Sequence, residues 1–188
     1  MLIRQATAAD AAQIVPLFNL ILEEMELPAL QKLSRATLNR AIQKAFASET
    51  YRTSKAQTLV AEVDERVAGF AFGYPDENEE AVNQKLLAIF PQVGFPAGTV
   101  LFEDDECFKN EWYLDSIAVS PSFQGKGIGT QLLKALPQIA RQNNKKCLGL
   151  NVDWANPNAA ALYKRHGFQK VGTTILSQHH YDHLQKEV

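Results

Sequence analysis

The sequence predicts a mixed α/β fold, with a largely antiparallel sheet that contains one central parallel pair of strands. The expected elements follow the order β-α-α-β-β, then an insertion, then β-α-β-α-β-β. A helix connects the strands at 112–120 and 145–152, so these two strands should be parallel neighbours. The length of 188 residues and the apolar fraction of 46% fit one domain over residues 1–188, with a substantial core.

The N-terminal part of the chain is typical of a short strand followed by a helix. Residues 2–7 form the expected strand, and Thr7 with Asp10 resembles a capping box. Apolar side chains then recur at helical spacing over residues 14–25. Pro16 lies within this stretch, so the predicted helix either kinks there or begins late.

A second helix and a hairpin are expected next. Apolar residues over 38–46 keep the same helical spacing. The segments 57–64 and 66–74 have the composition of strands, and they meet at a turn at Asp64-Glu65. Two strands joined by such a short turn form an antiparallel hairpin.

An acidic insertion at about 75–110 interrupts this alternation. It holds a predicted helix from about Glu77 to Phe90, followed by a Pro/Gly-rich loop over 91–98. The net charge over residues 76–110 is −6, whereas the rest of the chain carries +4. We expect either a solvated acidic loop or a surface that attracts a cation.

The second half of the chain alternates strands and helices more regularly. The strand at 112–120 leads into a glycine-rich loop and a helix over 127–142, with Pro137 inside it. The remaining expected elements are a strand at 145–152, a short helix that begins at about 156 and ends at Gly167, and closing strands at 168–176 and 179–185.

The composition excludes several classes of protein. Cys107 and Cys147 give neither a disulfide framework nor metal-ligand spacing, so we expect a reducing, cytoplasmic location. The N-terminal residues lack the pattern of a signal peptide, and no apolar run reaches the roughly 20 residues that span a bilayer. We expect neither a membrane nor nucleic acid as a partner. We also expect no metal, because His179, His180 and His183 lack a clear set of partner ligands.

The stretch Gln124–Leu133, QGKGIGTQLL, is typical of a phosphate-binding loop. Glycines that lead into a helix leave backbone amides free to hold an anion. The spacing fails the Walker pattern, because Lys126 lies between glycines instead of after the second one. It also fails the Rossmann pattern, because Gly125, Gly127 and Gly129 are two residues apart throughout. The loop therefore disfavours a domain that binds ATP or a dinucleotide.

Two motifs lie on either side of the strand at 145–152. The first reads Gln-x-x-Gly-x-Gly, and the second is an Asn followed seven residues later by a Tyr, with Gly-Phe close behind. The residues concerned are Gln124, Gly127 and Gly129 in the first motif and Asn156, Tyr163, Gly167 and Phe168 in the second. Together they resemble the GNAT superfamily of acyl-CoA-dependent N-acyltransferases over about 112–170. The resemblance implies a GNAT-like fold and acetyl-CoA as co-substrate.

The resemblance implies how coenzyme A is held. Backbone amides from Gly125 to Thr130 would point at the pyrophosphate, aided by the helix dipole and by the charge of Lys126. The preceding strand would diverge from its neighbour and offer the backbone of Ile117 and Val119 to the pantetheine arm. The expected cofactor-binding residues are Ile117, Ala118, Val119, Gln124, Gly125, Lys126, Gly127, Ile128, Gly129, Thr130, Asn156, Ala159 and Tyr163.

The resemblance also implies catalytic roles. The amide of Ile117 would stabilise the oxyanion of a tetrahedral intermediate. Tyr163 would protonate the departing CoA thiolate, since a phenol with a pKa of about 10 carries its proton at neutral pH. Asn156 would bind the CoA arm, and it also has the position of a helix cap before Pro157.

The general base stays open at this level. Simple alternation along the strand places Glu111, Tyr113 and Asp115 on one face with Ile117 and Val119, and we expect that face to line the cleft. Asp115 is the first candidate for a catalytic base or an amine-binding group, and Glu111 is the alternative. Either could act through a water molecule or attract the ammonium group of the substrate.

We therefore expect an N-acetyltransferase that moves an acetyl group from acetyl-CoA to a primary amine by direct attack in a ternary complex. The acceptor is a small-molecule or peptide amine, and the acidic insertion, above all Glu103–Glu106, would favour a cationic one. The alternative is a non-catalytic acyl-CoA-binding or sensing module. The protein should be a monomer or a homodimer, in which the last strands (168–186) could pair.

Overall fold

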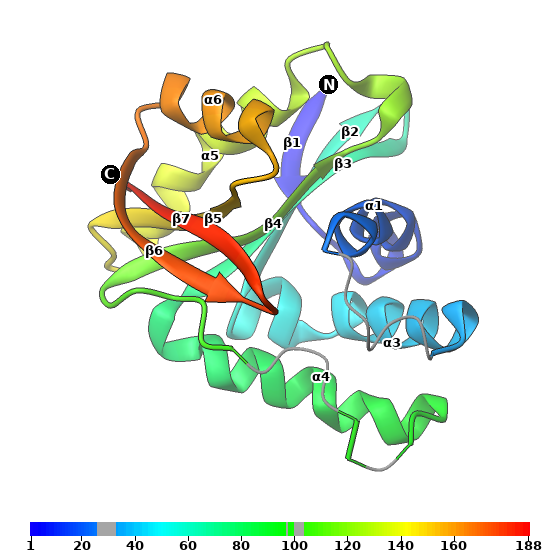
Figure 1. The fold of residues 1–188 in the computed structure, drawn as a ribbon. Helices are drawn as coiled ribbons and strands as arrows, with labels where there is room; N and C mark the ends of the chain where they lie inside the picture. Colours follow the sequence, from blue (N-terminus) through cyan, green and yellow to red (C-terminus); the bar gives the residue numbers. More distant parts are fainter. Residues whose placement is uncertain (26–32, 97, 100–103) are drawn as a thin grey trace.

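The computed structural model describes residues 1–25, 33–96, 98–99 and 104–188. Its strands form a seven-stranded sheet in the order β1-β2-β3-β4-β5-β7-β6 (Figure 1). They are β1 (Leu2–Gln5), β2 (Gln57–Val63), β3 (Arg66–Pro75), β4 (Glu111–Val119), β5 (Cys147–Asp153), β6 (Gln169–Leu176) and β7 (His179–Glu187). Neighbouring strands are antiparallel except β4 and β5, which are parallel, so the predicted fold class is confirmed.

Helices cover both faces of this sheet. On one face lie α1 (Ala11–Glu24), α3 (Arg35–Ala47) and α4 (Glu79–Val93), and on the other lie α5 (Ile128–Gln142) and α6 (Pro157–Arg165) (Figure 1). None of the described helices is long and apolar enough to cross a membrane. The sequence did not predict the short π-helical turn at Thr50–Ser54, which precedes β2.

Each face of the sheet has its own hydrophobic core. Side chains of α1, α3 and α4 pack against Phe70 and Phe72 of β3. Side chains of α5 and α6 pack against Trp112 of β4 and Leu148 of β5. Burying one such large apolar side chain contributes about 1.5–3 kcal/mol, so the two cores hold the central strands from both sides.

The predicted N-terminal signals are confirmed. The capping box is present at Thr7 and Asp10, and the guanidinium of Arg4 donates to both carboxylate oxygens of Asp10 at 2.8 Å. The helix α1 begins at Ala11, so Pro16 lies inside it and the helix does not begin late.

The predicted hairpin and crossover are also confirmed. Asp64 and Glu65, between β2 and β3, have positive φ angles of 49° and 61°. A two-residue turn with this geometry matches the twist of the strands that it joins. The crossover helix α5 connects the parallel neighbours β4 and β5.

One boundary in the acidic insertion differs from the prediction. The helix α4 continues past Phe90 and through Pro91 to Val93. Phe90 and Val93 are buried in the core, and this packing favours a further helical turn that the proline alone would disfavour. Gly94, with a φ angle of 91°, ends the helix.

The centre of β4 contains a β-bulge. Phe72 of β3 pairs with Ser116, and Gly73 pairs with Leu114, so Asp115 has no partner across the strand pair. A bulge inserts one extra residue into a strand and reverses the side-chain alternation beyond it.

This bulge overturns one expectation from the sequence. Tyr113 packs into the core beneath α1, α3 and α4, and Asp115 lies on that face as well. Ile117 and Val119 pack toward the opposite core. The expectation that Glu111, Tyr113 and Asp115 share a face with Ile117 and Val119 is therefore wrong.

The parallel pair of strands diverges soon after it begins. Three residue pairs join β4 to β5, and the last of them is Tyr113 with Gly149. Beyond this point the edge of β4 has no partner on β5. The divergence expected for the strand at 112–120 is present, and it sets the position of the site.

Candidate active site

A cavity of about 570 Å³ lies where β4 and β5 diverge. Its walls come from α1, the segment before β4, the two strands themselves, α6 and the hairpin of β6 and β7. The cavity therefore brings together parts of the chain that are far apart in the sequence.

One end of the cavity contains many of the predicted cofactor-binding residues. Those that line it are Ile117, Ala118, Val119, Gln124, Asn156, Ala159 and Tyr163. The side-chain amide of Gln124 donates to the carbonyl oxygen of Val119 at 3.3 Å, which ties the glycine loop to the end of β4.

The glycine loop lies beyond this end, at the exposed start of α5. Gly125 and Gly127 have φ angles of 74° and 77°, and Gly127 is the residue that caps α5. Glycine adopts this region without the strain that other residues incur. A Cβ atom on either residue would meet nothing within 4 Å, so an anion can approach the start of the helix.

The other residues of the loop have different surroundings. Lys126 folds back and donates to a backbone carbonyl at 3.2 Å. Ile128 is buried in the core, so only its backbone is available to a ligand. Gly129 packs near the end of β4, and the Thr130 hydroxyl lies 3.3 Å from Nε2 of His166.

Tyr163 is held in the wall of the cavity. Its side chain is 8% exposed and packs edge-on against Phe168, with ring centroids 5.8 Å apart. Burial raises the pKa of its phenol to about 12, and the charge of Glu24 adds to the rise. Tyr163 therefore keeps its proton at neutral pH, as a general acid must.

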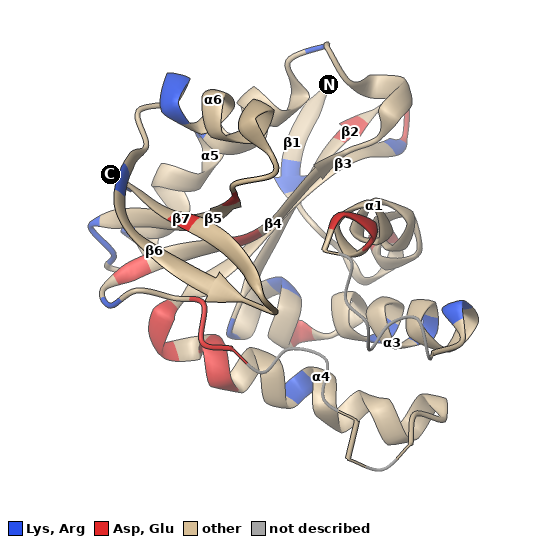
Figure 2. Cartoon of the chain, in the orientation of Figure 1, with Lys and Arg blue, Asp and Glu red and all other residues tan. Residues whose placement is uncertain are grey.

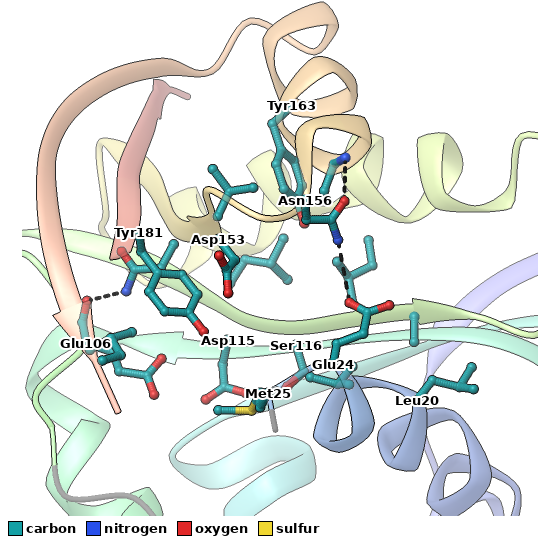
Figure 3. A pocket seen from close by; sticks show the side chains of 18 of the residues that line it. Leu20, Glu24, Met25, Glu106, Asp115, Ser116, Asp153, Asn156, Tyr163 and Tyr181 are labelled. Atoms are coloured by element: carbon teal, nitrogen blue, oxygen red, sulfur yellow. Dashed lines mark hydrogen bonds between the residues drawn. The ribbon is translucent and has the colours of Figure 1, made fainter. Parts of the chain in front are cut away.

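Asn156 caps α6. Its Oδ1 accepts from the amide of Ala159 at 3.0 Å, and its Nδ2 donates to Glu24 Oε2 at 3.5 Å (Figure 3). The helix-cap interpretation is confirmed, and Asn156 also lines the cavity. Its contact with coenzyme A stays a prediction.

The opposite end of the cavity is acidic. Glu106, Asp115 and Asp153 lie around the hydroxyl group of Tyr181 (Figure 3). Glu24 adds a fourth carboxylate to the lining. Among the residues that the structure describes, no Lys, Arg or His side chain lines the cavity. A cation that enters it would therefore meet negative charge from several elements.

Asp115 is placed by its neighbours on the same face of the sheet. The hydroxyl groups of Tyr74 and Ser116 donate to its two carboxylate oxygens, the first at 3.0 Å. Burial raises the pKa of Asp115 to about 6, although these hydrogen bonds oppose the rise. The carboxylate is therefore mostly ionised at neutral pH and can attract a cation.

Glu111 lies away from the cavity. It is completely buried, with Oε2 3.0 Å from Nε2 of His183 and Oε1 accepting from the amide of Phe108 at 2.7 Å. A Cβ atom at Gly149 would lie 1.8 Å from its side chain, so Glu111 fills the space that this glycine leaves. The expectation of Glu111 in the cleft as an alternative base is wrong, because a buried histidine and the β5 backbone enclose it.

The acidic insertion contributes to the cavity in part. Figure 2 shows acidic residues, in red, at the start of α4 and along the segment before β4. Within the stretch Glu103–Glu106, Glu106 lines the cavity, and Asp104 accepts from the amide of Ser177 at 2.9 Å. Glu103 lies outside the described residues.

Sequence reasoning missed three of the cavity's carboxylates as individual site residues. Asp153 ends β5, and the rule that ligands bind beyond the carboxyl ends of parallel strands could have indicated it. Glu106 was considered only as one acid of the insertion. Glu24 extends from the end of α1, and no local pattern indicates that this helix reaches the cavity.

The histidines of β7 take part in local contacts. His179 lies 3.3 Å from Asp153, and His183 is buried beside Glu111. Within the described ranges, no group of three or more His, Cys, Asp or Glu side chains is arranged to hold a metal ion.

Comparison with known proteins relates the chain to acetyltransferases. An acetyltransferase of known crystal structure is 43% identical, with a TM-score of 0.87 and complete coverage of both chains. The uncharacterized N-acetyltransferase YhfO of Bacillus subtilis (strain 168) is 28% identical over 170 residues, which are 90% of this chain and 91% of that protein.

Two further comparisons agree. The spermine/spermidine N(1)-acetyltransferase of Bacillus subtilis (strain 168) is 39% identical over 79 residues, which are 41% of this chain and 52% of that protein. The model of the acetyltransferase (GNAT) family matches residues 17–168. The cavity, the glycine loop and these matches together show that the chain belongs to the GNAT family of acetyltransferases.

Proposed function

We propose that this protein transfers an acetyl group from acetyl-CoA to a primary amine by direct attack in a ternary complex. The observation that carries the proposal is the cavity between the diverging strands, which has the glycine loop beyond one end and carboxylates at the other. A non-catalytic acyl-CoA-binding module is the alternative. The protonated Tyr163 in the cavity wall favours the enzyme.

The donor binds along β4 and the start of α5. Backbone amides from Gly125 to Thr130 hold the pyrophosphate, because the first amides of a helix lack partners within it and lie at its positive end. The edge of β4 beyond Tyr113 has no strand partner on β5, so the backbone of Ile117 and Val119 can pair with an extended pantetheine arm.

The chemistry takes place beside β4. The amine nitrogen attacks the thioester carbon, and the amide of Ile117 donates to the developing oxyanion. When the carbon–sulfur bond breaks, Tyr163 gives its proton to the thiolate. Burial of Tyr163 keeps the phenol protonated until the carbon–sulfur bond breaks.

The acceptor is a cationic primary amine that enters the acidic end. Asp115, ionised at neutral pH, attracts its ammonium group, and Asp153 adds a second negative charge. An acceptor of this class agrees with the name of the spermine/spermidine N(1)-acetyltransferase, which matches part of this chain.

Calorimetry with acetyl-CoA and free CoA tests donor binding, and thiol release tests transfer across an amine panel. The panel contains spermidine, 1,4-diaminobutane, an aminoglycoside, a lysine-bearing peptide and 1-aminobutane. We expect both CoA ligands to bind and at least one amine to release the thiol. Absence of binding at millimolar concentration would contradict the proposal, and binding without turnover would support the non-catalytic module.

A further inference from the structure

Glu106 has one carboxylate oxygen that accepts no hydrogen bond from the part of the chain that the structure describes. Its Oε2 accepts from the hydroxyl of Tyr113 at 2.6 Å. Among the described residues, every fully buried side-chain oxygen has a hydrogen-bond partner, whereas Oε1 of Glu106 has none. Oε1 is therefore not fully buried. Because Glu106 lines the cavity, Oε1 is open to a molecule that enters it.

A hydrogen-bonded network fixes the direction of the Tyr113 hydroxyl. The Nδ2 group of Asn151 donates to the oxygen of Tyr113 and to the backbone carbonyl of Glu106, both at 3.1 Å. The Tyr113 oxygen is therefore an acceptor toward Asn151, and its own hydrogen points to Glu106. The carbonyl contact also fixes which end of the Asn151 amide carries the nitrogen.

The network continues into the interior of the protein. Oδ1 of Asn151 lies 2.7 Å from Nδ1 of His183, so this ring nitrogen must be the donor. The other ring nitrogen of His183 lies 3.0 Å from Glu111, and the ring stacks on Phe108 with centroids 3.7 Å apart. Both ring nitrogens of the buried histidine therefore have a polar neighbour within hydrogen-bond distance, and the ring can hold Asn151 in one orientation.

We propose that Glu106 accepts the proton that the substrate ammonium must lose before it attacks, and that Tyr113, Asn151, His183 and Glu111 position it for this role. This inference rests on the proposed amine acetylation. It assigns different roles to the two carboxylates. Both oxygens of Asp115 accept hydrogen bonds and hold the cation, whereas Glu106 has an oxygen free to take a proton.

The groups that face Glu106 are acidic or neutral. They are Asp115 and Tyr113 on β4, Tyr74 on β3, Glu79 on α4, Tyr181 on β7, and Asp104 and Cys107 in its own segment. Burial is the largest cause that raises the pKa of Glu106, to about 8, and the charge of Asp115 adds to it. The hydrogen bond from Tyr113 lowers this pKa. Arrival of an ammonium group would favour the ionised form.

The proton balance of the transfer closes with these groups. The ammonium gives one proton to the Glu106 carboxylate, and the freed nitrogen pair attacks the thioester carbon. On collapse, the sulfur takes the proton of Tyr163, and the second nitrogen proton restores the phenol. Glu106 then releases its proton to solvent, so the products are the amide, the CoA thiol and one proton.

The test compares Tyr113→Phe with Tyr74→Phe, since each removes one hydroxyl from a buried ring and frees a different carboxylate. Activity requires ionised Glu106, so kcat/KM should rise with pH through the pKa of Glu106. In Tyr113→Phe this rising limb of the pH profile should move to higher pH by about one unit. At pH values below the limb, kcat/KM should be about tenfold lower than in the wild type. In Tyr74→Phe the limb should not move up.

The kinetics use acetyl-CoA and the fastest amine of the panel. Nuclear magnetic resonance titration of labelled glutamate carboxyl groups, without substrate, follows the pKa of Glu106 directly, with Glu106→Gln to assign its signal. The kinetic limb and this pKa should move together in Tyr113→Phe, which a merely structural role would not produce.

Two outcomes would overturn the assignment. If the limb moves up in Tyr74→Phe and stays in place in Tyr113→Phe, Asp115 is the proton acceptor. If neither or both variants move it up, the positioning network does not act on catalysis. A wild-type protein without any acetyl-CoA-dependent thiol release would contradict the proposed function itself, which separates that failure from these two.

Discussion

At the scale of single residues, Tyr163 and the carboxylates have environments that separate their protonation states. Tyr163 is buried beside Phe168 and keeps its proton well above neutral pH. Burial raises the pKa of Asp115 to about 6 and two hydroxyl groups that donate to it oppose the rise, so it is mostly ionised at neutral pH. A proton donor and a negative charge thus coexist at neutral pH in one cavity, which suits attack by an amine on a thioester.

Replacing Tyr163 by Phe should remove the general acid and leave the donor site intact. We expect kcat to fall about 10²-fold, with the dissociation constant of acetyl-CoA within about twofold of the wild-type value, a change of under about 0.5 kcal/mol. Thiol-release kinetics and calorimetry measure the two quantities. Tyr51→Phe, which removes a buried hydroxyl outside this cavity, is the control and should keep kcat within a few-fold. Unchanged turnover in Tyr163→Phe would exclude the residue as the acid.

At the scale of elements, the bulge in β4 places the group that attracts the acceptor, and the start of α5 places the amides that bind the pyrophosphate. The bulge turns Asp115 toward the acidic end and leaves Ile117 and Val119 on the other face. The left-handed Gly127 directs the chain into α5, and a Cβ atom on it would meet nothing within 4 Å, so a ligand can approach the start of this helix. Anchoring of the donor's pyrophosphate and reception of the acceptor therefore depend on separate elements.

Gly127→Ala should weaken donor binding specifically. The variant strains the loop and disturbs amides that contact the pyrophosphate, so we expect KM for acetyl-CoA to rise about tenfold and KM for the amine to stay constant. Gly94→Ala is a matched control, because Gly94 also has a positive φ angle, 91° against 77°, and open space around it. Both variants should lose similar stability on thermal unfolding. An equal rise of KM in both would contradict a donor-specific role for the loop.

At the scale of the whole molecule, the sheet brings negative charge from distant segments to one cavity. Glu24 comes from α1, Glu106 from the acidic insertion, Asp115 from β4 and Asp153 from β5. The two cores hold these segments in place from both faces of the sheet. The negative electrostatic potential in the cavity therefore depends on the folded structure, and it should favour amines with more positive charge.

A diamine should therefore be preferred over a monoamine of equal length, and salt should reduce this preference. We expect kcat/KM for 1,4-diaminobutane to exceed that for 1-aminobutane at low salt. The ratio should fall toward one as salt approaches about 1 M, where the screening length is about 3 Å. Steady-state kinetics over a salt series measure the ratio.

A pair of charge-matched variants locates the source of this preference. Asp153→Asn removes a carboxylate from the cavity, whereas Glu80→Gln removes one from the exposed surface of α4. The ratio should fall in the first and stay constant in the second. A diamine preference that is insensitive to both salt and Asp153 would rule out selection by the charge of the cavity.

Local patterns predicted most of the fold correctly. The hairpin turn at Asp64-Glu65, the helix over 38–46 and the crossover between parallel strands all follow from short-range periodicity and connection length. The end of α4 did not, because burial of Val93 extends a helix through Pro91. Propensity acts between near neighbours, whereas such burial depends on residues elsewhere in the chain.

The sequence alone determined the family resemblance and predicted the donor, because its two motifs lie in short, contiguous segments whose glycines and helix start act locally. Tertiary structure decided the acceptor end. A single bulged residue, Asp115, reversed the alternation of side chains along β4. Glu111 is buried beside His183 and lies away from the cavity. Strand pairing and the approach of distant helices set which carboxylates share a cavity, and these long-range contacts leave no periodic signal along the chain.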